Sequence, residues 1–230
     1  MIVAIIPARK GSKRVPHKNI KKFYDRPMIG WPITTALNSG CFDQVIVSTD
    51  CKETSDIARR YGAETPFDRP ENLADDFTPT SAVVKHAISW LAENRKEPSI
   101  VCCIYATAAL ISPSDLKNGL KALQEHDADF AISVSEYSHP IERALKCNQQ
   151  GYIDMLDRQK QNVRSQDLMP AWHDAGQFYW GFTKSWKENK QFFAGKSVPL
   201  FLPANRAKDI DTNEDWKIAE LLFAANSKGE

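Results

Sequence analysis

The feature that most constrains this fold is a regular alternation between short apolar runs and stretches with helical spacing. Apolar runs of strand length occupy residues 2–7, 44–49, 100–105 and 130–134. Helical spacing fills the gaps between them, over residues 27–38, 53–61, 79–94 and 113–126. Strands that alternate with helices predict an α/β fold with a doubly wound, mostly parallel, Rossmann-like sheet. The length of 230 residues suits a single domain.

Three prolines mark where helices are expected to begin. Thr78-Pro79 and Ser112-Pro113 each place a capping hydroxyl before a proline at the first helical position. Pro32 lies inside the first helical stretch, where it predicts a kink or a late start.

The alternation stops after Glu136. Residues 143–155 have the pattern of a hairpin that turns at Gln149-Gln150-Gly151, and a polar stretch follows. We therefore expect residues 137–180 to be an insertion that forms a dimerisation arm or a lid. Three elements should follow the polar stretch: a strand over 177–182, a strand over 198–202 and a helix over 213–226.

Composition limits the setting in which the protein works. The formal net charge is +1, so no global positive charge points to nucleic acid or to an anionic membrane. The apolar N-terminal run is too short for a signal peptide or a membrane span, because Arg9 and Lys10 follow it. The five cysteines form no CxxC pair, which suits a reducing cytoplasm. Cys102 and Cys103 are best explained as small core residues.

A basic loop follows the first predicted strand, at the edge where open α/β sheets bind their ligands. Five cations crowd this loop: Arg9, Lys10, Lys13, Arg14 and Lys18. Gly11-Ser12 allows close backbone approach and offers amide N–H groups to an anion. The combination suits a triphosphate, although a solvated basic turn is the simpler alternative. The glycines of a Walker loop or of a dinucleotide-binding loop are missing.

The loop resembles the signature of the CMP-acylneuraminate synthetase family of cytidylyltransferases. The similar residues are Ile5-Ile6-Pro7-Ala8-Arg9, Gly11-Ser12-Lys13-Arg14 and Lys18-Asn19. The similarity continues in order through Val45 to Asp50, Arg69 to Asp76, and Asp209 to Thr212. It implies the nucleotide-diphospho-sugar transferase type of α/β fold, and an enzyme that transfers CMP from CTP to a nine-carbon keto-sugar acid.

The resemblance also implies which residues form the nucleotide site. Arg9, Ser12 and Lys18 would bind the triphosphate, with Lys18 near the α-phosphate. Arg69 and Thr80 would contact the cytidine half, although Arg69 could instead form a surface ion pair with Asp68 or Glu71. The whole implied nucleotide set is Ala8, Arg9, Gly11, Ser12, Lys18, Asn19, Arg69 and Thr80, in which Arg9 and Lys18 are also catalytic.

Asp209 and Asp211 form the predicted metal site, with Asp211 as a further catalytic residue. Residues two apart on an extended segment point to the same side, so both carboxylates could bind Mg²⁺ or Mn²⁺. The alternative is helix capping, since Asp211 and Thr212 precede the last predicted helix. The two roles could divide, with Thr212 capping the helix.

The departures from the family pattern lie in the sugar half of the chain. Tyr105 replaces a glutamine that family members direct at the sugar, and the stretch from His173 to Trp180 differs as well. The resulting pattern looks like the pseudaminic acid cytidylyltransferases of flagellated bacteria. Pseudaminic acid is deoxygenated and doubly N-acylated, so its site should offer more apolar area. The implied sugar-binding residues are Tyr105, Arg164, Gln166, His173, Gln177 and Tyr179, with Arg164 for the carboxylate.

Several alternatives remain open at this point. Phe178 and Trp180 alternate along a strand, so one face of it could be core, and His173-Asp174 could be a hairpin pair. The sugar could be N-acetylneuraminic or legionaminic acid. A UDP- or GDP-sugar-forming enzyme would have a different loop, and a non-catalytic nucleotide-binding protein would have lost Lys18, Asp209 or Asp211. The resemblance further implies a homodimer in which the insertion reaches the partner's sugar pocket.

Overall fold

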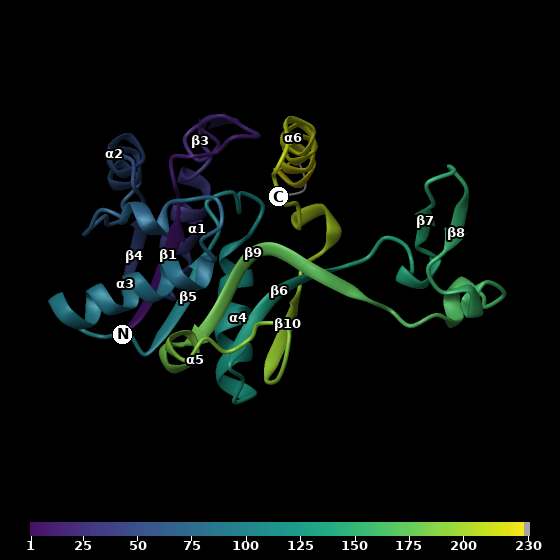
Figure 1. The fold of residues 1–230 in the computed structure, drawn as a ribbon. Helices are drawn as coiled ribbons and strands as arrows, with labels where there is room; N and C mark the ends of the chain where they lie inside the picture. Colours follow the sequence, from purple (N-terminus) through teal and green to yellow (C-terminus); the bar gives the residue numbers. More distant parts are fainter. Residues whose placement is uncertain (228–230) are drawn as a thin grey trace.

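The structure, a computed structural model, describes residues 1–227, so the last three residues of the predicted domain lie outside it. At its centre is a six-stranded sheet of order β10-β6-β9-β5-β1-β4 (Figure 1). Only β9 is antiparallel to its neighbours in this sheet. The prediction of a mostly parallel α/β sheet is therefore confirmed. The strands are β1 (Ile2–Pro7), β4 (Gln44–Ser48), β5 (Ile100–Ile104), β6 (Phe130–Glu136), β9 (Trp172–Phe182) and β10 (Ser197–Phe201).

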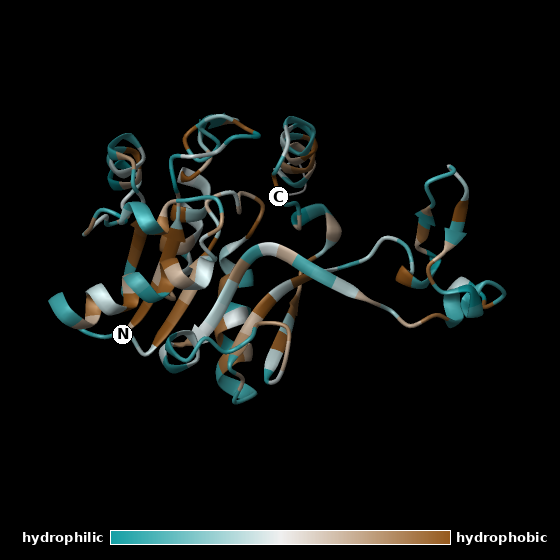
Figure 2. Cartoon of the chain, in the orientation of Figure 1, coloured by the Kyte–Doolittle hydropathy of each residue, from teal (hydrophilic) through white to brown (hydrophobic). Residues whose placement is uncertain are grey.

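Helices cover both faces of this sheet because its inner strands are apolar on both sides. Ala4 and Ile6 of β1 pack in one core cluster with α1 (Gly30–Ser39), α2 (Lys52–Arg60) and α4 (Pro113–Glu125). Val3 and Ile5 pack in the other cluster, with α3 (Thr80–Asn94) and α5 (Thr183–Lys187). Cys102 and Cys103 of β5 divide between the two clusters in the same way, as core residues. Figure 2 shows the apolar strands between the more polar helices.

The helix starts follow the prolines in two of three cases. Ser112 caps α4 in a capping box with Asp115, as predicted. The helix that contains Pro32 starts late, at Gly30. The predicted Thr78 cap is wrong, because α3 begins at Thr80 and Pro79 precedes it in an extended conformation. Asp75 instead accepts hydrogen bonds from the amides of Phe77 and Thr78 at 2.9 and 2.6 Å, which holds this loop in a turn.

The segment after β6 forms an arm that extends away from the sheet (Figure 1). Its hairpin consists of β7 (Leu145–Cys147) and β8 (Ile153–Met155), as the sequence predicts. The chain returns in β9, whose first residues pair with the end of β6, Asp174 opposite Val134 and His173 opposite Ser135. His173 and Asp174 therefore lie in the central sheet. The arm also contains the short 3-10 turns η2 (Ile141–Arg143), η3 (Arg158–Lys160) and η4 (Ser165–Asp167).

A third apolar cluster joins the basic loop to the end of the chain. Val15 of the loop and Phe23 pack with Ile210 and with Trp216 of α6 (Asn213–Ser227). This cluster brings the segment of Asp209 and Asp211 beside the basic loop. The remaining short elements are β2 (Lys22–Phe23), β3 (Arg26–Pro27), η1 (Glu71–Leu73) and η5 (Ala204–Arg206). Within residues 1–227, no helix is both long enough and apolar enough to span a membrane.

Candidate active site

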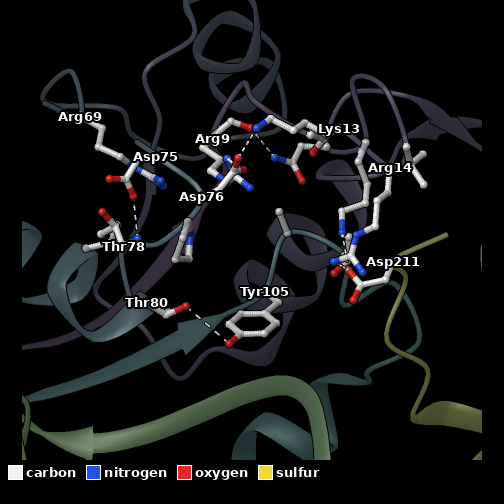
Figure 3. A pocket seen from close by; sticks show the side chains of 18 of the residues that line it. Arg9, Lys13, Arg14, Arg69, Asp75, Asp76, Thr78, Thr80, Tyr105 and Asp211 are labelled. Carbon is white, nitrogen blue, oxygen red and sulfur yellow. Dashed lines mark hydrogen bonds and ion pairs between the residues drawn. The ribbon is translucent and has the colours of Figure 1, made fainter. Parts of the chain in front are cut away.

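A cavity of about 250 Å³ opens at the carboxyl edge of the parallel strands, where the basic loop leaves β1 (Figure 3). It collects side chains from the loop, from the segment between Arg69 and Thr80, and from the end of β5. Among the residues that line it are Arg9, Ser12, Lys13, Arg14, Lys18, Asn19, Arg69, Asp76, Thr80, Tyr105 and Asp211. Seven of the predicted catalytic and nucleotide-binding residues therefore meet in one place: Arg9, Ser12, Lys18, Asn19, Arg69, Thr80 and Asp211.

Hydrogen bonds to the backbone fix the course of the basic loop. The Lys10 amide donates to Asp50 Oδ1 at 2.8 Å, which ties the loop to the segment after β4. Asn19 Nδ2 donates to the Arg9 carbonyl at 3.0 Å, so its amide closes the loop on itself. Gly11 is open to solvent, and a Cβ there would meet Arg9 Nη1 at 3.1 Å. The loop cations therefore extend from a backbone that these hydrogen bonds hold in place.

Two carboxylates balance four of the loop's cations. Asp76 pairs with Arg9 at 2.7 Å and with Lys13, and these partners hold the pKa of its carboxyl below the usual value. Asp211 pairs with Arg14 at 2.9 Å and with Lys18 at 3.5 Å (Figure 3). The cations are therefore assembled around one cavity, which is the arrangement an oligophosphate requires and an isolated basic turn lacks.

Asp209 is exposed and Asp211 is half-buried. Asp211 lines the cavity, while the Asp209 carboxyl packs against Gly176 of β9. Partial desolvation of its carboxyl by the surrounding chain, with the Asp211 carboxylate as the next cause, raises the pKa of Asp209. A carboxyl whose charge is disfavoured by a neighbouring carboxylate suits a hard divalent cation. In the described part of the chain, no three His, Cys, Asp or Glu side chains could hold a metal together, so phosphate oxygens would have to complete the coordination.

Thr212 caps the last helix, as predicted. Its hydroxyl accepts from the Asp215 amide at 3.1 Å, and Asp215 Oδ2 accepts from the Thr212 amide at 2.9 Å. This reciprocal pair starts α6 in the manner of a capping box. The Asp211 side chain is consequently left to face the cations of the loop.

Arg69 is a buried cation at the edge of the cavity, with 5% of its surface exposed. Its Nε donates to Ser48 Oγ at 3.1 Å and its Nη2 to the Ser48 carbonyl oxygen. Burial lowers its pKa to about 10. The alternative of a surface ion pair is therefore wrong. A buried guanidinium beside a cavity has donors that a polar ligand can use.

A second cavity of about 180 Å³ adjoins the first one. Thr80 and Tyr105 line both cavities, and they form the wall between them, with 3.5 Å from Thr80 Oγ1 to Tyr105 Oη (Figure 3). The other residues that line the second cavity are Pro79, Ser81, Asp174, Tyr179, Phe192 and Phe193. Half of its lining residues are thus aromatic, in contrast to the cationic lining of the first cavity.

Comparison with known proteins decides the family. A family model described as Cytidylyltransferase matches residues 3–215. The chain belongs to the cytidylyltransferase family. The match includes the basic loop, Arg69, both cavities and the segment of Asp209 and Asp211.

Individual relatives of this cytidylyltransferase agree with that result. It is 42% identical over 224 residues to the pseudaminic acid cytidylyltransferase of Campylobacter jejuni subsp. jejuni serotype O:2, covering 97% of each chain. It is 30% identical to the CMP-N,N'-diacetyllegionaminic acid synthase of Legionella pneumophila subsp. pneumophila, over 99% of this chain and 98% of that protein. Its fold is similar to that of a CMP:2-keto-3-deoxy-manno-octonic acid synthetase complexed with CTP, with a TM-score of 0.71, 16% identity and coverage of 98% and 99%.

The predicted sugar-binding residues of this cytidylyltransferase lie in four different places. Tyr105 and Tyr179 line the second cavity. Gln177 is buried in β9, and its amide donates to the carbonyls of Ala175 and Lys208 at 2.8 and 3.3 Å. His173 packs on Tyr137 at the base of the arm. Arg164 and Gln166 lie in the arm, away from both cavities of their own chain. Of the predicted nucleotide-binding residues, Ala8 is buried in the core at the start of the basic loop.

Sequence reasoning missed several residues that line the cavities, and Asp76, Phe192 and Phe193 are examples. Asp76 pairs with Arg9 and Lys13, and its position in the stretch from Arg69 to Asp76 could have indicated it. Phe192 packs on Tyr179 at 5.2 Å, and Phe193 is largely exposed at the second cavity. The only sequence signal for these two rings was an adjacent aromatic pair in a polar segment.

Proposed function

We propose that this cytidylyltransferase transfers CMP from CTP to the anomeric hydroxyl of pseudaminic acid, which gives CMP-pseudaminic acid and pyrophosphate. The observation that carries the proposal is the pair of adjoining cavities, one cationic and one aromatic, which share the wall of Thr80 and Tyr105. A triphosphate and an N-acylated sugar need these two kinds of surface side by side. The named relative from Campylobacter jejuni supports the same substrate.

The residues of the cationic cavity have separate tasks in this reaction. The sugar hydroxyl attacks the α-phosphorus and releases its proton to water, the bond from the α-phosphorus to the oxygen that bridges to the β-phosphate breaks, and pyrophosphate leaves. Lys18 and Arg9 stabilise the negative charge that spreads over the phosphate oxygens, and Arg14 and Lys13 hold the leaving pyrophosphate. Arg69 and Thr80 orient the cytidine half. The phosphates would displace Asp76 from Arg9 and Lys13, since both anions need the same cations.

Asp209 and Asp211 would hold Mg²⁺ or Mn²⁺ together with the phosphates. When bound, such a cation would polarise phosphate oxygens and neutralise part of their charge. The raised pKa of Asp209, to which the neighbouring Asp211 carboxylate contributes, supports this assignment, because a divalent cation would relieve the repulsion between the two groups.

The aromatic cavity suits the less polar sugar. Tyr105, Tyr179, Phe192 and Phe193 offer ring surface for the deoxy carbon and the N-acyl methyl groups. A polyhydroxylated acid would leave several hydroxyls without partners against the same rings, which disfavours it.

We further propose that the enzyme is a homodimer in which each arm reaches the second cavity of its partner. Arg164 would bind the sugar carboxylate there and Gln166 a neighbouring polar group. Large apolar side chains along the arm support this proposal, because single chains rarely expose so many together. The exposed residues are Leu145, Tyr152, Ile153, Leu156 and Met169. A light-scattering mass that stays at one chain at micromolar concentration would contradict it.

We place the enzyme in the cytoplasm as part of the same proposal. Its five cysteines are all free thiols in the structure, including the exposed Cys147, as expected in a reducing compartment.

Pyrophosphate release tests the proposed reaction. CTP, Mg²⁺ and pseudaminic acid should give stoichiometric pyrophosphate and a product with the mass of CMP-pseudaminic acid. UTP in place of CTP should give little release. Equal activity with UTP, or release without a CMP-sugar product, would overturn the proposed function.

A further inference from the structure

Asp174 occupies a special position in β9, at the point where the pairing with β6 shifts register between Ile132 and Val134. Its Oδ1 accepts a 2.9 Å hydrogen bond from the Gly176 amide. Gly176 has a φ of 60°, a left-handed conformation that favours glycine. The carboxylate is thus anchored by the irregularity of its own strand and points into the second cavity.

The other oxygen of Asp174 accepts a hydrogen bond from the Tyr179 hydroxyl. The Tyr179 ring contacts the Tyr105 ring, with centroids 5.5 Å apart and planes inclined by 56°. Tyr105 Oη lies 3.5 Å from Thr80 Oγ1, at the boundary with the first cavity. One chain of contacts therefore runs from Asp174 to the wall that both cavities share.

The protonation state of Tyr179 determines the direction of its hydrogen bond with Asp174. Burial is the main cause that raises the pKa of Tyr179 far above the usual value, and Tyr105 and Asp174 raise it further. The phenol therefore keeps its proton and serves as a donor. A neutral phenol that donates to a carboxylate forms a strong, charge-assisted hydrogen bond, which restricts the ring to one orientation.

We propose that Asp174 is a positioning residue for the sugar acid: it holds the Tyr179 ring in the second cavity, and through this ring it positions Tyr105 in the wall between the two cavities. The proposal rests on the proposed function, because it assigns the aromatic cavity to the sugar. Asp174 acts through Tyr179, so the two residues form one unit. Loss of either residue should therefore leave the Tyr105 ring free to change its orientation.

Asp174→Asn and Tyr179→Phe test the unit, alone and combined, by steady-state kinetics. Each single variant should raise the KM for the sugar acid about tenfold, as expected for the loss of a charge-assisted hydrogen bond that orders a binding surface. The KM for CTP should stay within about twofold and kcat within about threefold. The double variant should resemble either single one, because residues that act as a unit are not additive.

Asp56→Asn is the matched control, since this carboxylate pairs with Arg59 at 3.1 Å on the outer surface of α2. It should have wild-type kinetics. Multiplied losses in the double variant would overturn the proposal, because Asp174 would then contact the sugar independently of Tyr179. So would a fall in kcat of about 10² or more together with loss of the acidic limb of the pH profile, which marks a general base.

Turnover by the wild type distinguishes failure of the proposed function from failure of the role of Asp174. If the wild type accepts pseudaminic acid and the variants keep wild-type KM values, only the role of Asp174 is overturned. If the wild type releases no pyrophosphate with any sugar acid, the proposed function fails and the role of Asp174 fails with it.

Discussion

Lys18 and Ile210 are joined by a 2.6 Å hydrogen bond from the lysine Nζ to the carbonyl oxygen, although 192 positions separate them in the chain. The same ammonium lies 3.5 Å from Asp211 Oδ1. The basic loop and the acidic segment therefore meet at one cation. The cluster of Val15, Ile210 and Trp216 holds them together from below. Lys18 is thus placed by the acidic segment before any phosphate arrives.

Lys18→Met should lower kcat/KM for CTP by about 10³, because it removes a preorganised charge from the phosphates. Lys18→Arg should recover part of the activity, since it keeps the charge but has a planar group in place of a compact one. Thermal unfolding of each variant checks that the fold persists. A loss of less than tenfold in Lys18→Met would show that Lys18 does not face the reacting phosphate.

Asp209→Asn and Asp211→Asn should each raise the Mg²⁺ concentration for half-maximal activity by about tenfold or more. Activity is measured against a metal titration, with Asp56→Asn as the control. CTP binding in the presence of a chelator provides a second readout. Asp211→Asn should bind CTP without metal at least as well as the wild type does, since it releases Arg14 and Lys18 from an ion pair. An unchanged metal titration in both variants would exclude these residues as ligands.

Tyr105→Gln should reduce kcat/KM for pseudaminic acid by about tenfold or more, because it replaces ring surface in the wall with a polar amide. The same variant should improve turnover of N-acetylneuraminic acid relative to the wild type. Tyr105→Phe keeps the ring and loses only the contact with Thr80, so its effect should be smaller. If Tyr105→Gln and Tyr105→Phe changed kcat/KM equally for all the sugar acids, the Tyr105 ring would not contact the sugar.

Asp215→Ala should lower the free energy of unfolding at pH 7 by about 1 kcal/mol, through loss of the reciprocal cap with Thr212. The Lys208 ammonium, with Thr212, holds the pKa of Asp215 well below its usual range. A lowered folded pKa contributes stability above the carboxyl's ordinary pKa, and this stability is lost as the pH falls through the folded value. The difference from the wild type should therefore persist at pH 5 and shrink below pH 4.

Urea unfolding at these pH values provides the measurement. Glu214→Ala is the matched control, because Glu214 also lies in the first turn of α6 and no hydrogen bond of its side chain caps the helix among the described residues. A pH-independent difference for Asp215→Ala would mean that its charge does not contribute.

Local periodicity was enough to predict most of the fold. The strands that became β1, β4, β5 and β6 are short apolar runs, and the helices between them repeat every three to four residues. The position of β9 between β5 and β6 could not be predicted, because pairing between strands distant in sequence leaves no local pattern. Its first residues, from Trp172 on, continue the pairing past a register shift, so the strand is longer than its apolar run.

The candidate site divides in the same way. The cations of the basic loop lie close together in the sequence, which is enough to predict an anion site. Their position after β1 places them at the carboxyl edge of the sheet. Asp76, Phe192 and Phe193 lie in the cavities because of tertiary contacts that leave no local pattern. Asp76 pairs with Arg9, and Phe192 packs on Tyr179. The Thr78 cap failed because the Thr78 hydroxyl donates to the Asn72 carbonyl oxygen at 3.3 Å, while the Asp75 carboxylate holds the Thr78 amide in a turn.

The most direct test of the account compares kcat/KM for pseudaminic, legionaminic and N-acetylneuraminic acids, with CTP and Mg²⁺ under identical conditions. The account predicts that pseudaminic acid is preferred by about tenfold or more over each of the others, because the aromatic cavity leaves extra hydroxyls unpaired. A preference for either other acid would contradict the assignment of the sugar and keep the nucleotidyl transfer. Absence of pyrophosphate release with all three acids would contradict the proposed reaction itself.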